Sequence, residues 1–192
     1  NYKNGEMDGL WEFFYENGQL EGSGNYKNGD RDGLWESFYE NGQLEGKENY
    51  KNGELDGLSE HYYDHGLLKD RTNYNNGKLD GYNEEYRESG ELYVRRGYKN
   101  GIQGSWEFFH TNGQVQDRRY YKNGKVYLSE TFDKEGNLIG KGGDTLYTEK
   151  YYKNGRIKSR IGNSKPEWIF EKFYQNGQLE ETRNYKNGKL NG

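Results

Sequence analysis

Asn1–Gly5 reads NYKNG, and the same five letters return at Asn25–Gly29 and Asn49–Gly53, with NYNNG at Asn73–Gly77. The step from Asn1 to Asn25, and from each copy to the next, is 24 residues. A fixed interval of this size is the signature of a repeat architecture. The four letters YKNG then return at less regular intervals, starting at Tyr98, Tyr121, Tyr152 and Tyr185.

The first 24-residue unit carries two Asn-Gly pairs, Asn4-Gly5 and Asn17-Gly18, and every later unit of this length keeps a glycine at both positions. Asn-Gly between alternating apolar residues is a strong hairpin signal, because both residues accept the positive φ of a type I′ turn. The sequence therefore predicts an all-β, elongated β-meander of stacked hairpins, with about sixteen short antiparallel strands in one twisted sheet. We expect one domain over 1–192, regular over 1–124 and 167–192 and degenerate over 125–166, where Gly142-Gly143 and Gly162–Pro166 replace the lost turns.

The composition agrees with a β protein and restricts its partners. Only 29% of residues are hydrophobic and the mean hydropathy is -1.43, but 17% are aromatic, with 20 Tyr, which argues against disorder. The net charge is -4 with no basic cluster, so nucleic acid is not expected as a partner, and a membrane partner is disfavoured. No apolar run approaches about 20 residues and no signal peptide is visible. We expect a mature or excised piece of a longer protein, in a compartment that the sequence leaves open.

Aligning the units on their second turn glycine exposes two columns. One is aromatic throughout and the other aliphatic: Phe14, Phe38, Tyr62, Tyr86, Phe109, Phe132, Tyr151 and Phe173, and Leu20, Leu44, Leu68, Leu92, Val115, Leu138, Ile157 and Leu179. A two-residue loop at Asn17-Gly18 would set Tyr15 opposite Leu20, whereas a bulge at Gly18 would set Phe14 there. We favour the bulge, because it gathers both columns with those of Leu10 and Tyr26 on one face.

The opposite face then carries the candidate partner-binding residues. These are Trp11, Phe13, Tyr15, Trp35, Tyr39 and Trp106. This face is aromatic in the early repeats and polar later, where Ser59 and Asn83 replace Trp. A recognition surface varies in this way, and so does a solvated face under weak constraint.

A third column is acidic: Glu12, Glu36, Glu60, Glu84, Glu107, Glu130, Glu149 and Glu171. We interpret it as a solvated row spaced about 9.6 Å apart, with a cation-binding stripe as the alternative.

The sequence predicts no enzyme, no cofactor and no metal site. His61, His65 and His110 occupy positions that other units fill with Phe, Tyr or Asn. Asn28–Gly33 resembles the start of a calcium loop, but Tyr39 stands where the loop requires Glu. The chain also lacks a phosphate-binding Gly-rich motif and has no Cys.

The motif YKNG-x-x-DG-x-W-x-x-(F/Y)-(F/Y)-ENGQL, at Tyr2–Leu20 and Tyr26–Leu44, resembles the bacterial variant of the MORN repeat. The resemblance implies a non-enzymatic scaffold for protein–protein interaction, and some relatives are labelled as antitoxins. A cell-surface carbohydrate or cell-wall-binding module is an alternative, and a lipid-surface module a weaker one. We also expect self-association through open sheet edges.

Overall fold

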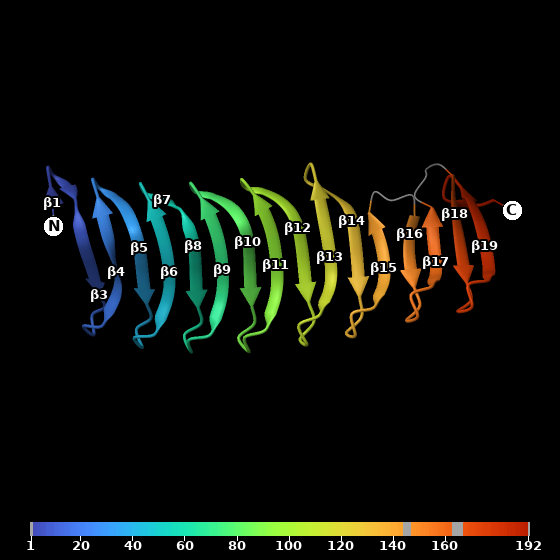
Figure 1. The fold of residues 1–192 in the computed structure, drawn as a ribbon, viewed down its shortest axis with the longest axis horizontal. Coiled ribbons are helices and arrows are strands. Elements are labelled where there is room, and N and C mark those ends of the chain that lie inside the picture. Colours follow the sequence, from blue (N-terminus) through green and yellow to red (C-terminus); the bar gives the residue numbers. More distant parts are fainter. Residues whose placement is uncertain (1, 144–146, 163–166, 192) are drawn as a thin grey trace. The chain divides into compact units, whose positions relative to one another are not determined.

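The computed structural model describes residues 2–143, 147–162 and 167–191, and these residues form strands and turns without any helix (Figure 1). Two compact units divide the chain, residues 1–103 (unit 1) and residues 104–192 (unit 2). In each unit antiparallel strands follow one another as an open meander of hairpins. The predicted all-β meander of short antiparallel strands is therefore confirmed.

The boundary between the units falls inside β12 (Ile102–Phe109). Unit 1 holds β1 (Tyr2–Lys3), β2 (Glu6–Met7), β3 (Gly9–Phe14), β4 (Leu20–Lys27), β5 (Asp30–Phe38), β6 (Leu44–Lys51), β7 (Glu54–Leu55), β8 (Gly57–Tyr62), β9 (Leu68–Asn75), β10 (Lys78–Tyr86) and β11 (Leu92–Lys99). Unit 2 continues with β13 (Val115–Lys122), β14 (Lys125–Phe132), β15 (Leu138–Gly143), β16 (Tyr147–Tyr151), β17 (Ile157–Gly162), β18 (Glu167–Phe173), β19 (Leu179–Lys186) and β20 (Lys189–Leu190).

The two Asn-Gly pairs of a repeat form different turns. At Asn28-Gly29 both residues have positive φ, 50° and 83°, which is the predicted type I′ turn. At Asn17-Gly18 only Gly18 has positive φ, 84°, and its N–H donates to the Tyr15 carbonyl (2.9 Å). The Asn17 side chain instead accepts the N–H of Gln19 (2.9 Å), which holds a type I turn followed by a Gly bulge. The type I′ turn is therefore found at the first pair, and the Gly18 bulge that the sequence favoured is found at the second.

The degenerate region contains two further departures from prediction. Lys153-Asn154-Gly155 has the same sequence as the type I′ turns but forms the type I turn with a Gly bulge. The Gly155 N–H donates to the Tyr152 carbonyl (2.9 Å), as the Gly18 N–H does to Tyr15. The turn predicted at Gly142-Gly143 was wrong, since both glycines pair within β15, opposite Ser129 and Leu128 of β14. Of the turn predicted at Gly162–Pro166, Gly162 ends β17 and residues 163–166 lie outside the described part.

The bulged register favoured from the sequence is confirmed next to the turn, where Phe14 pairs with Leu20. Beyond that pair Phe13 pairs with Gly22 and Trp11 with Gly24, which is the register that a two-residue loop would give. Glu21 is thereby the extra residue in β4. This extra residue reverses the alternation beyond it, so Tyr26 pairs with Gly9 on the side of Trp11 and Phe13. The expectation that Tyr26 lies with Phe14 and Leu20 was therefore wrong.

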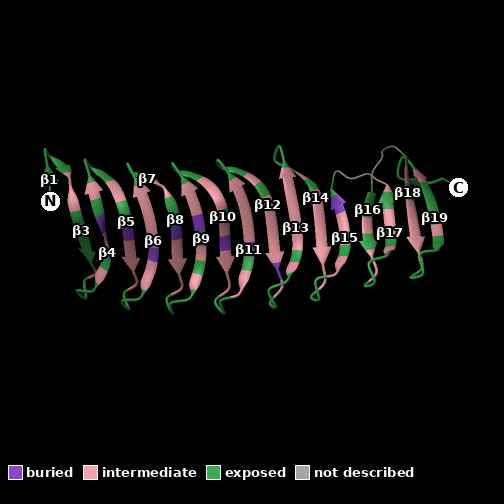
Figure 2. Cartoon of the chain, in the orientation of Figure 1, coloured by how far each residue is buried: buried purple, intermediate pink, exposed green. Residues whose placement is uncertain are grey.

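Few side chains are fully covered, as Figure 2 shows. Among the described residues the buried apolar side chains are Trp35, Val94 and Phe109, and the buried polar ones are Ser59, Thr72 and Glu84. Stability therefore depends on cross-strand pairs and interlocking turns between adjacent repeats rather than on a thick core.

Candidate functional site

One face of unit 1 carries interlocked aromatic rings. This aromatic face comprises Trp11, Phe13, Tyr26, Trp35 and Tyr50. Centroid distances are 5.9 Å for Trp11–Tyr26, 4.9 Å for Tyr26–Trp35 and 6.5 Å for Trp35–Tyr50, each pair meeting edge to face. Such pairs contribute about 0.5–1.5 kcal/mol each beyond their burial. Much of the early aromatic content is therefore structural.

Trp35 lies flat on the backbone and has no open ring face. A Cβ on Gly24 would lie 2.2 Å from Trp35 Cδ2, so only glycine leaves room for the indole. The opposite ring face is covered by the guanidinium of Arg31, 4.3 Å from the ring centroid. Trp35 Nε1 donates to the Asn25 carbonyl (3.0 Å), and the residue is 6% exposed.

A hollow of about 290 Å³ opens beside this ring. Its floor is a cross-strand row of small residues, in which Ser37 of β5 stands between Gly22 of β4 and Gly46 of β6. Phe13, which is 39% exposed, and Trp35 form its apolar walls. Glu21, Arg31 and Glu48 complete the lining, together with Glu36, whose carboxylate pairs with Lys47 on the other face of the sheet. The small residues therefore create a concave spot with apolar walls and charged groups.

Charged groups beside the hollow form a connected network. Arg31 Nη1 donates to the Tyr50 hydroxyl (3.1 Å), which donates to Glu48 Oε2 (2.7 Å). His61 Nε2 lies 3.5 Å from Glu48 Oε1, and His61 Nδ1 lies 2.9 Å from Asp70 Oδ1. Hydrogen bonds to Asp70 and then to Glu48 raise the pKa of His61 to about 10. His61 is therefore a cation at neutral pH that braces two carboxylates.

Tyr15 and Tyr39 lie at the turns, where each links one repeat to the next. The Tyr15 hydroxyl donates to the Phe38 carbonyl (2.7 Å), and the Tyr39 hydroxyl donates to the Tyr62 carbonyl (2.6 Å). Burial, followed by nearby carboxylates, raises the pKa of both hydroxyls, so both remain donors. The structure thus brings Trp11, Phe13 and Trp35 together and places these two tyrosines in structural links.

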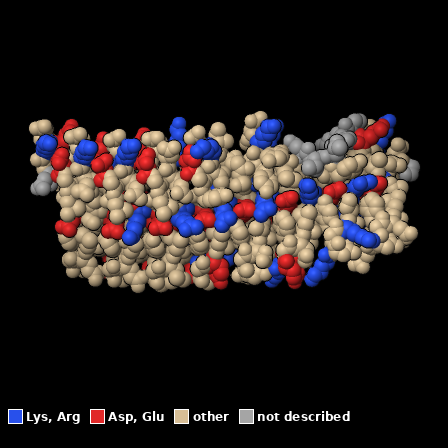
Figure 3. Space-filling model, viewed as in Figure 1, with Lys and Arg blue, Asp and Glu red and all other residues tan. Residues whose placement is uncertain are grey.

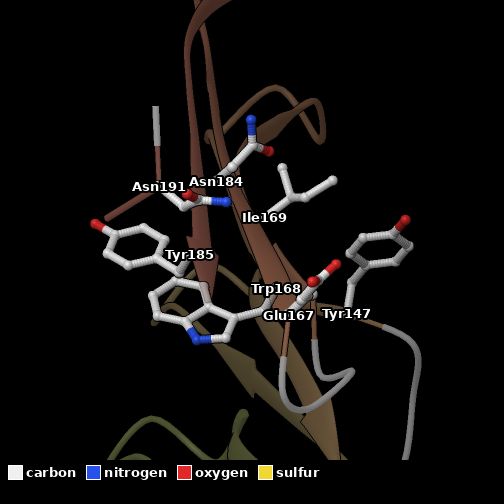
Figure 4. A pocket seen from close by; sticks show the side chains of 8 residues that line it. Tyr147, Glu167, Trp168, Ile169, Asn184, Tyr185 and Asn191 are labelled. Atoms are coloured by element: carbon white, nitrogen blue, oxygen red, sulfur yellow. The ribbon is translucent and has the colours of Figure 1, made fainter. Parts of the chain in front are cut away.

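Trp106 lies in unit 2, tilted against Phe108 with ring centroids 5.0 Å apart. The same unit contains aromatic residues that sequence reasoning missed. Trp168 stacks on Tyr185 with centroids 3.8 Å apart and an interplanar angle of 7°, beside a hollow of about 400 Å³ (Figure 4). Trp168 pairs with Tyr185 in the way that Gly9 pairs with Tyr26, so Trp168 occupies the repeat position of Gly9 and not that of Trp11. The column of Trp11 therefore could not reveal it.

The other face of unit 1 carries the acidic column, and between its carboxylates stand cations. We call it the ladder face and define it by Leu10, Glu12 and Phe14 of β3 and the residues in register with them. Across the strands the order is Glu12, Ser23, Glu36, Lys47, Glu60, Arg71, Glu84 and Arg95. Figure 3 shows the red and blue row crossing the strands. The acidic column is therefore neither an isolated solvated row nor an open stripe for cations.

Glu84 is the most buried member of this ladder. Arg71 Nε and Arg95 Nε both donate to its carboxylate, and its side chain is 5% exposed. Burial alone would raise the pKa of Glu84, but the two arginine hydrogen bonds outweigh burial and lower it. In unit 2, Arg118 likewise lies between Glu107 (2.7 Å) and Glu130 (3.7 Å).

Within the described ranges no group of three or more His, Cys, Asp or Glu side chains is arranged to hold a metal ion. A membrane-spanning helix was sought in the same ranges, and none was found.

Comparison with protein families gives four matches to the MORN repeat variant, at residues 7–28, 31–52, 102–123 and 169–187. Each matched segment spans the second turn type and most of its two flanking strands, such as β3 and β4 or β5 and β6. The resemblance to a variant of the MORN repeat is thus confirmed for these four segments. MORN repeats are generally modules of protein or membrane interaction. No curated protein matches the chain.

Proposed function

We propose that this chain is a non-enzymatic repeat scaffold, and that it binds a protein partner through the aromatic face of unit 1. The observation that carries the proposal is the hollow of about 290 Å³ that Phe13 and Trp35 line. Protein interfaces concentrate their binding energy where an anchor side chain fills a pocket with aromatic walls. The volume suits a single large side chain rather than a drug-sized ligand.

The lining indicates the chemistry of that anchor. Arg31 is already engaged with Trp35 and Tyr50, whereas Glu21 lines the hollow as an exposed carboxylate. An Arg or Lys side chain of the partner fits best, because its apolar stem would lie along Phe13 and its cationic end would reach Glu21. The net charge of -4 favours a basic partner as well.

The burial of Trp35 favours a protein over a carbohydrate. Sugar rings stack on open aromatic faces, and both faces of Trp35 are covered, by Gly24 and by Arg31. A lipid-surface role is disfavoured by the net charge. An antitoxin-like role in a bacterial cell is the narrower form of the proposal, in which the captured partner is a toxic protein that the scaffold inhibits.

The test compares Phe13→Asp with Tyr82→Asp, a matched change on the ladder face, where Tyr82 is 53% exposed. Both variants and the parent chain are used to capture proteins from a bacterial lysate, and the captured protein is then purified and titrated. We expect Phe13→Asp to weaken binding about tenfold or more and Tyr82→Asp to leave it unchanged. Equal affinity for all three chains would contradict the proposed site.

Two further measurements separate the alternatives. Binding to a glycan array that disappears in Phe13→Asp would favour the carbohydrate module. Co-expression with the purified partner's gene tests the antitoxin-like role, because only an inhibitory scaffold restores growth.

A further inference from the structure

The ladder face of unit 1 exposes apolar side chains in a row beside the charges. Leu10, Leu34, Leu58 and Tyr82 are 57%, 45%, 38% and 53% exposed. They share this face because each lies two residues before a ladder carboxylate on its strand. On the other side of the charges Phe14 is 57% exposed. Asn25, Asn49 and Asn73 stand between the apolar residues of the row, so exposed apolar side chains alternate with amides. Large apolar side chains exposed repeatedly along one face mark an interaction site.

We propose that this face is covered by the same face of a second copy of the chain. The order of the charges along the ladder favours this partner. Seen across β3 to β11, the ladder carries four carboxylates and three cations, with Ser23 in the one neutral position. A partner must present the opposite charge every strand spacing, about 4.8 Å, and a second copy carries that pattern already.

Two in-plane twofold axes could bring these faces together, and the charges select one. A twofold axis along the ladder would place each carboxylate over the same carboxylate of the second copy, so like charges would oppose one another. An axis parallel to the strands, midway between β6 and β8, reverses the order instead. Lys47 then faces Glu60 of the other copy, Glu36 faces Arg71, and Glu12 faces Arg95. This axis pairs opposite charges at every position of the ladder of unit 1 except one, where Ser23 faces Glu84.

The same axis leaves the apolar row on its own side of the charges. It lays β5 over β9, which brings Leu34 over Asn73 of the second copy, since Asn73 pairs with Leu58 in the same row. Eight strands about 4.8 Å apart and about 20 Å of strand length give roughly 750 Å² per copy. That area equals one side of a standard stable interface.

The ladder also suits burial between two sheets. Its charges are already paired within one copy, as Lys47 with Glu36 (3.3 Å) and Arg95 with Glu84 (2.8 Å). Paired and hydrogen-bonded charges lose far less on burial than isolated ones. The dimer uses the face opposite the hollow, so it is independent of the proposed partner site.

Sedimentation velocity of the full chain, from low micromolar to several hundred micromolar, tests the dimer. We expect a concentration-dependent dimer that is lost in Leu34→Glu and retained in Phe13→Glu, a control on the aromatic face. Circular dichroism verifies that both variants fold. A monomer at every concentration, or a dimer that survives Leu34→Glu, overturns the proposal.

Because the chain has no Cys, cross-linking tests the axis separately. Leu34→Cys and Asn73→Cys chains of different tag length are mixed and treated with a short thiol cross-linker. We expect the mixed dimer to cross-link and neither variant alone to do so, since two copies of Leu34 would lie about three strand spacings apart. Efficient cross-linking of Leu34→Cys alone would refute the axis.

Discussion

Replacing Gly24 by Ala tests whether the aromatic face depends on a glycine floor. Gly24 lies within β4, and its φ is outside the positive range, so the backbone accepts an alanine. The added Cβ would lie 2.2 Å from Trp35 Cδ2, well inside contact distance. Trp35 must therefore move, and the cost comes from its displacement.

The burial of Trp35 sets the size of the effect. An aromatic side chain buries about 150–250 Å², and at about 25 cal/mol per Å² complete expulsion would cost about 4–6 kcal/mol as an upper bound. Loss of the hydrogen bond to the Asn25 carbonyl would add about 1 kcal/mol. Overpacking that is relieved by partial movement costs about 1–3 kcal/mol. We therefore expect Gly24→Ala to destabilise unit 1 by about 2–4 kcal/mol.

Urea unfolding followed by far-UV circular dichroism measures the change, and two comparisons make it specific. At Gly140 an added Cβ has its nearest neighbour at 3.7 Å, so Gly140→Ala should change the free energy of unfolding by about 0.5 kcal/mol or less. In a Trp35→Ser background Gly24→Ala should become nearly neutral, because the indole is gone. The third and fourth repeats already show such an exchange, because Thr72 at the position of Gly24 lies opposite Asn83 at the position of Trp35. An equal cost of Gly24→Ala in both backgrounds would refute the reasoning.

Three other predictions concern single side chains. The pKa of His61 is raised from 6.5 to about 10, so its contribution to stability is complete below pH 6.5 and is lost as the pH rises towards 10. In urea unfolding, the difference in free energy of unfolding between the parent and His61→Gln should shrink over that range. A constant difference would contradict this. Glu84→Gln should lower the free energy of unfolding by about 2–4 kcal/mol, because two arginines lose their carboxylate. Glu12→Gln, at the exposed end of the same column, should lower it by about 0.5 kcal/mol or less. Equal shifts of the urea midpoint in the two variants would argue against the ladder. Tyr39→Phe removes the hydroxyl link between repeats and should lower thermal stability by about 0.5–1.5 kcal/mol, with Tyr82→Phe as the neutral control, and an unchanged melting temperature for Tyr39→Phe would count against the link.

The repeat, its turns and the register could be predicted because they depend on local chemistry. Asn28-Gly29 requires two residues that tolerate positive φ, and few other pairs do. The pairing of Phe14 with Leu20 followed from requiring the two regular columns to share a face. Both inferences use only residues that are near one another in the chain.

The predicted face of Tyr26 was wrong because of a local irregularity that the sequence does not reveal. Strand alternation assigns every second residue to one face, and one extra residue inverts the assignment beyond it. A second bulge, separate from the one predicted at Gly18, leaves Glu21 unpaired in β4, so counting from Leu20 reaches Tyr26 with the wrong parity. The Tyr15 link escaped prediction as well, because its acceptor, the Phe38 carbonyl, lies 23 residues away.

Both charged columns of the ladder are present in the sequence, but their alternation appears only when the pairing between consecutive hairpins is known. A basic residue stands three positions after the aliphatic column in six units: Lys47, Arg71, Arg95, Arg118, Lys141 and Arg160. Placing these residues against the glutamates requires the pairing of β4 with β5 or of β6 with β8, which joins consecutive hairpins. The acidic column alone therefore suggested an isolated row.

The two faces of unit 1 differ in what the repeats hold constant, and this difference connects the two proposals. At the position of Trp11 the next repeats carry Trp35, Ser59 and Asn83, whereas at the position of Glu12 they all carry Glu. A varying face offers a partner one distinct location, as the hollow beside Trp35 does. Because the ladder face repeats the same charges, a second copy could bind it in several registers that differ by one repeat. In each of them charges of one copy would face opposite charges of the other. The register with the axis between β6 and β8 alone overlaps all eight strands of unit 1, so buried apolar area, rather than charge, must select it.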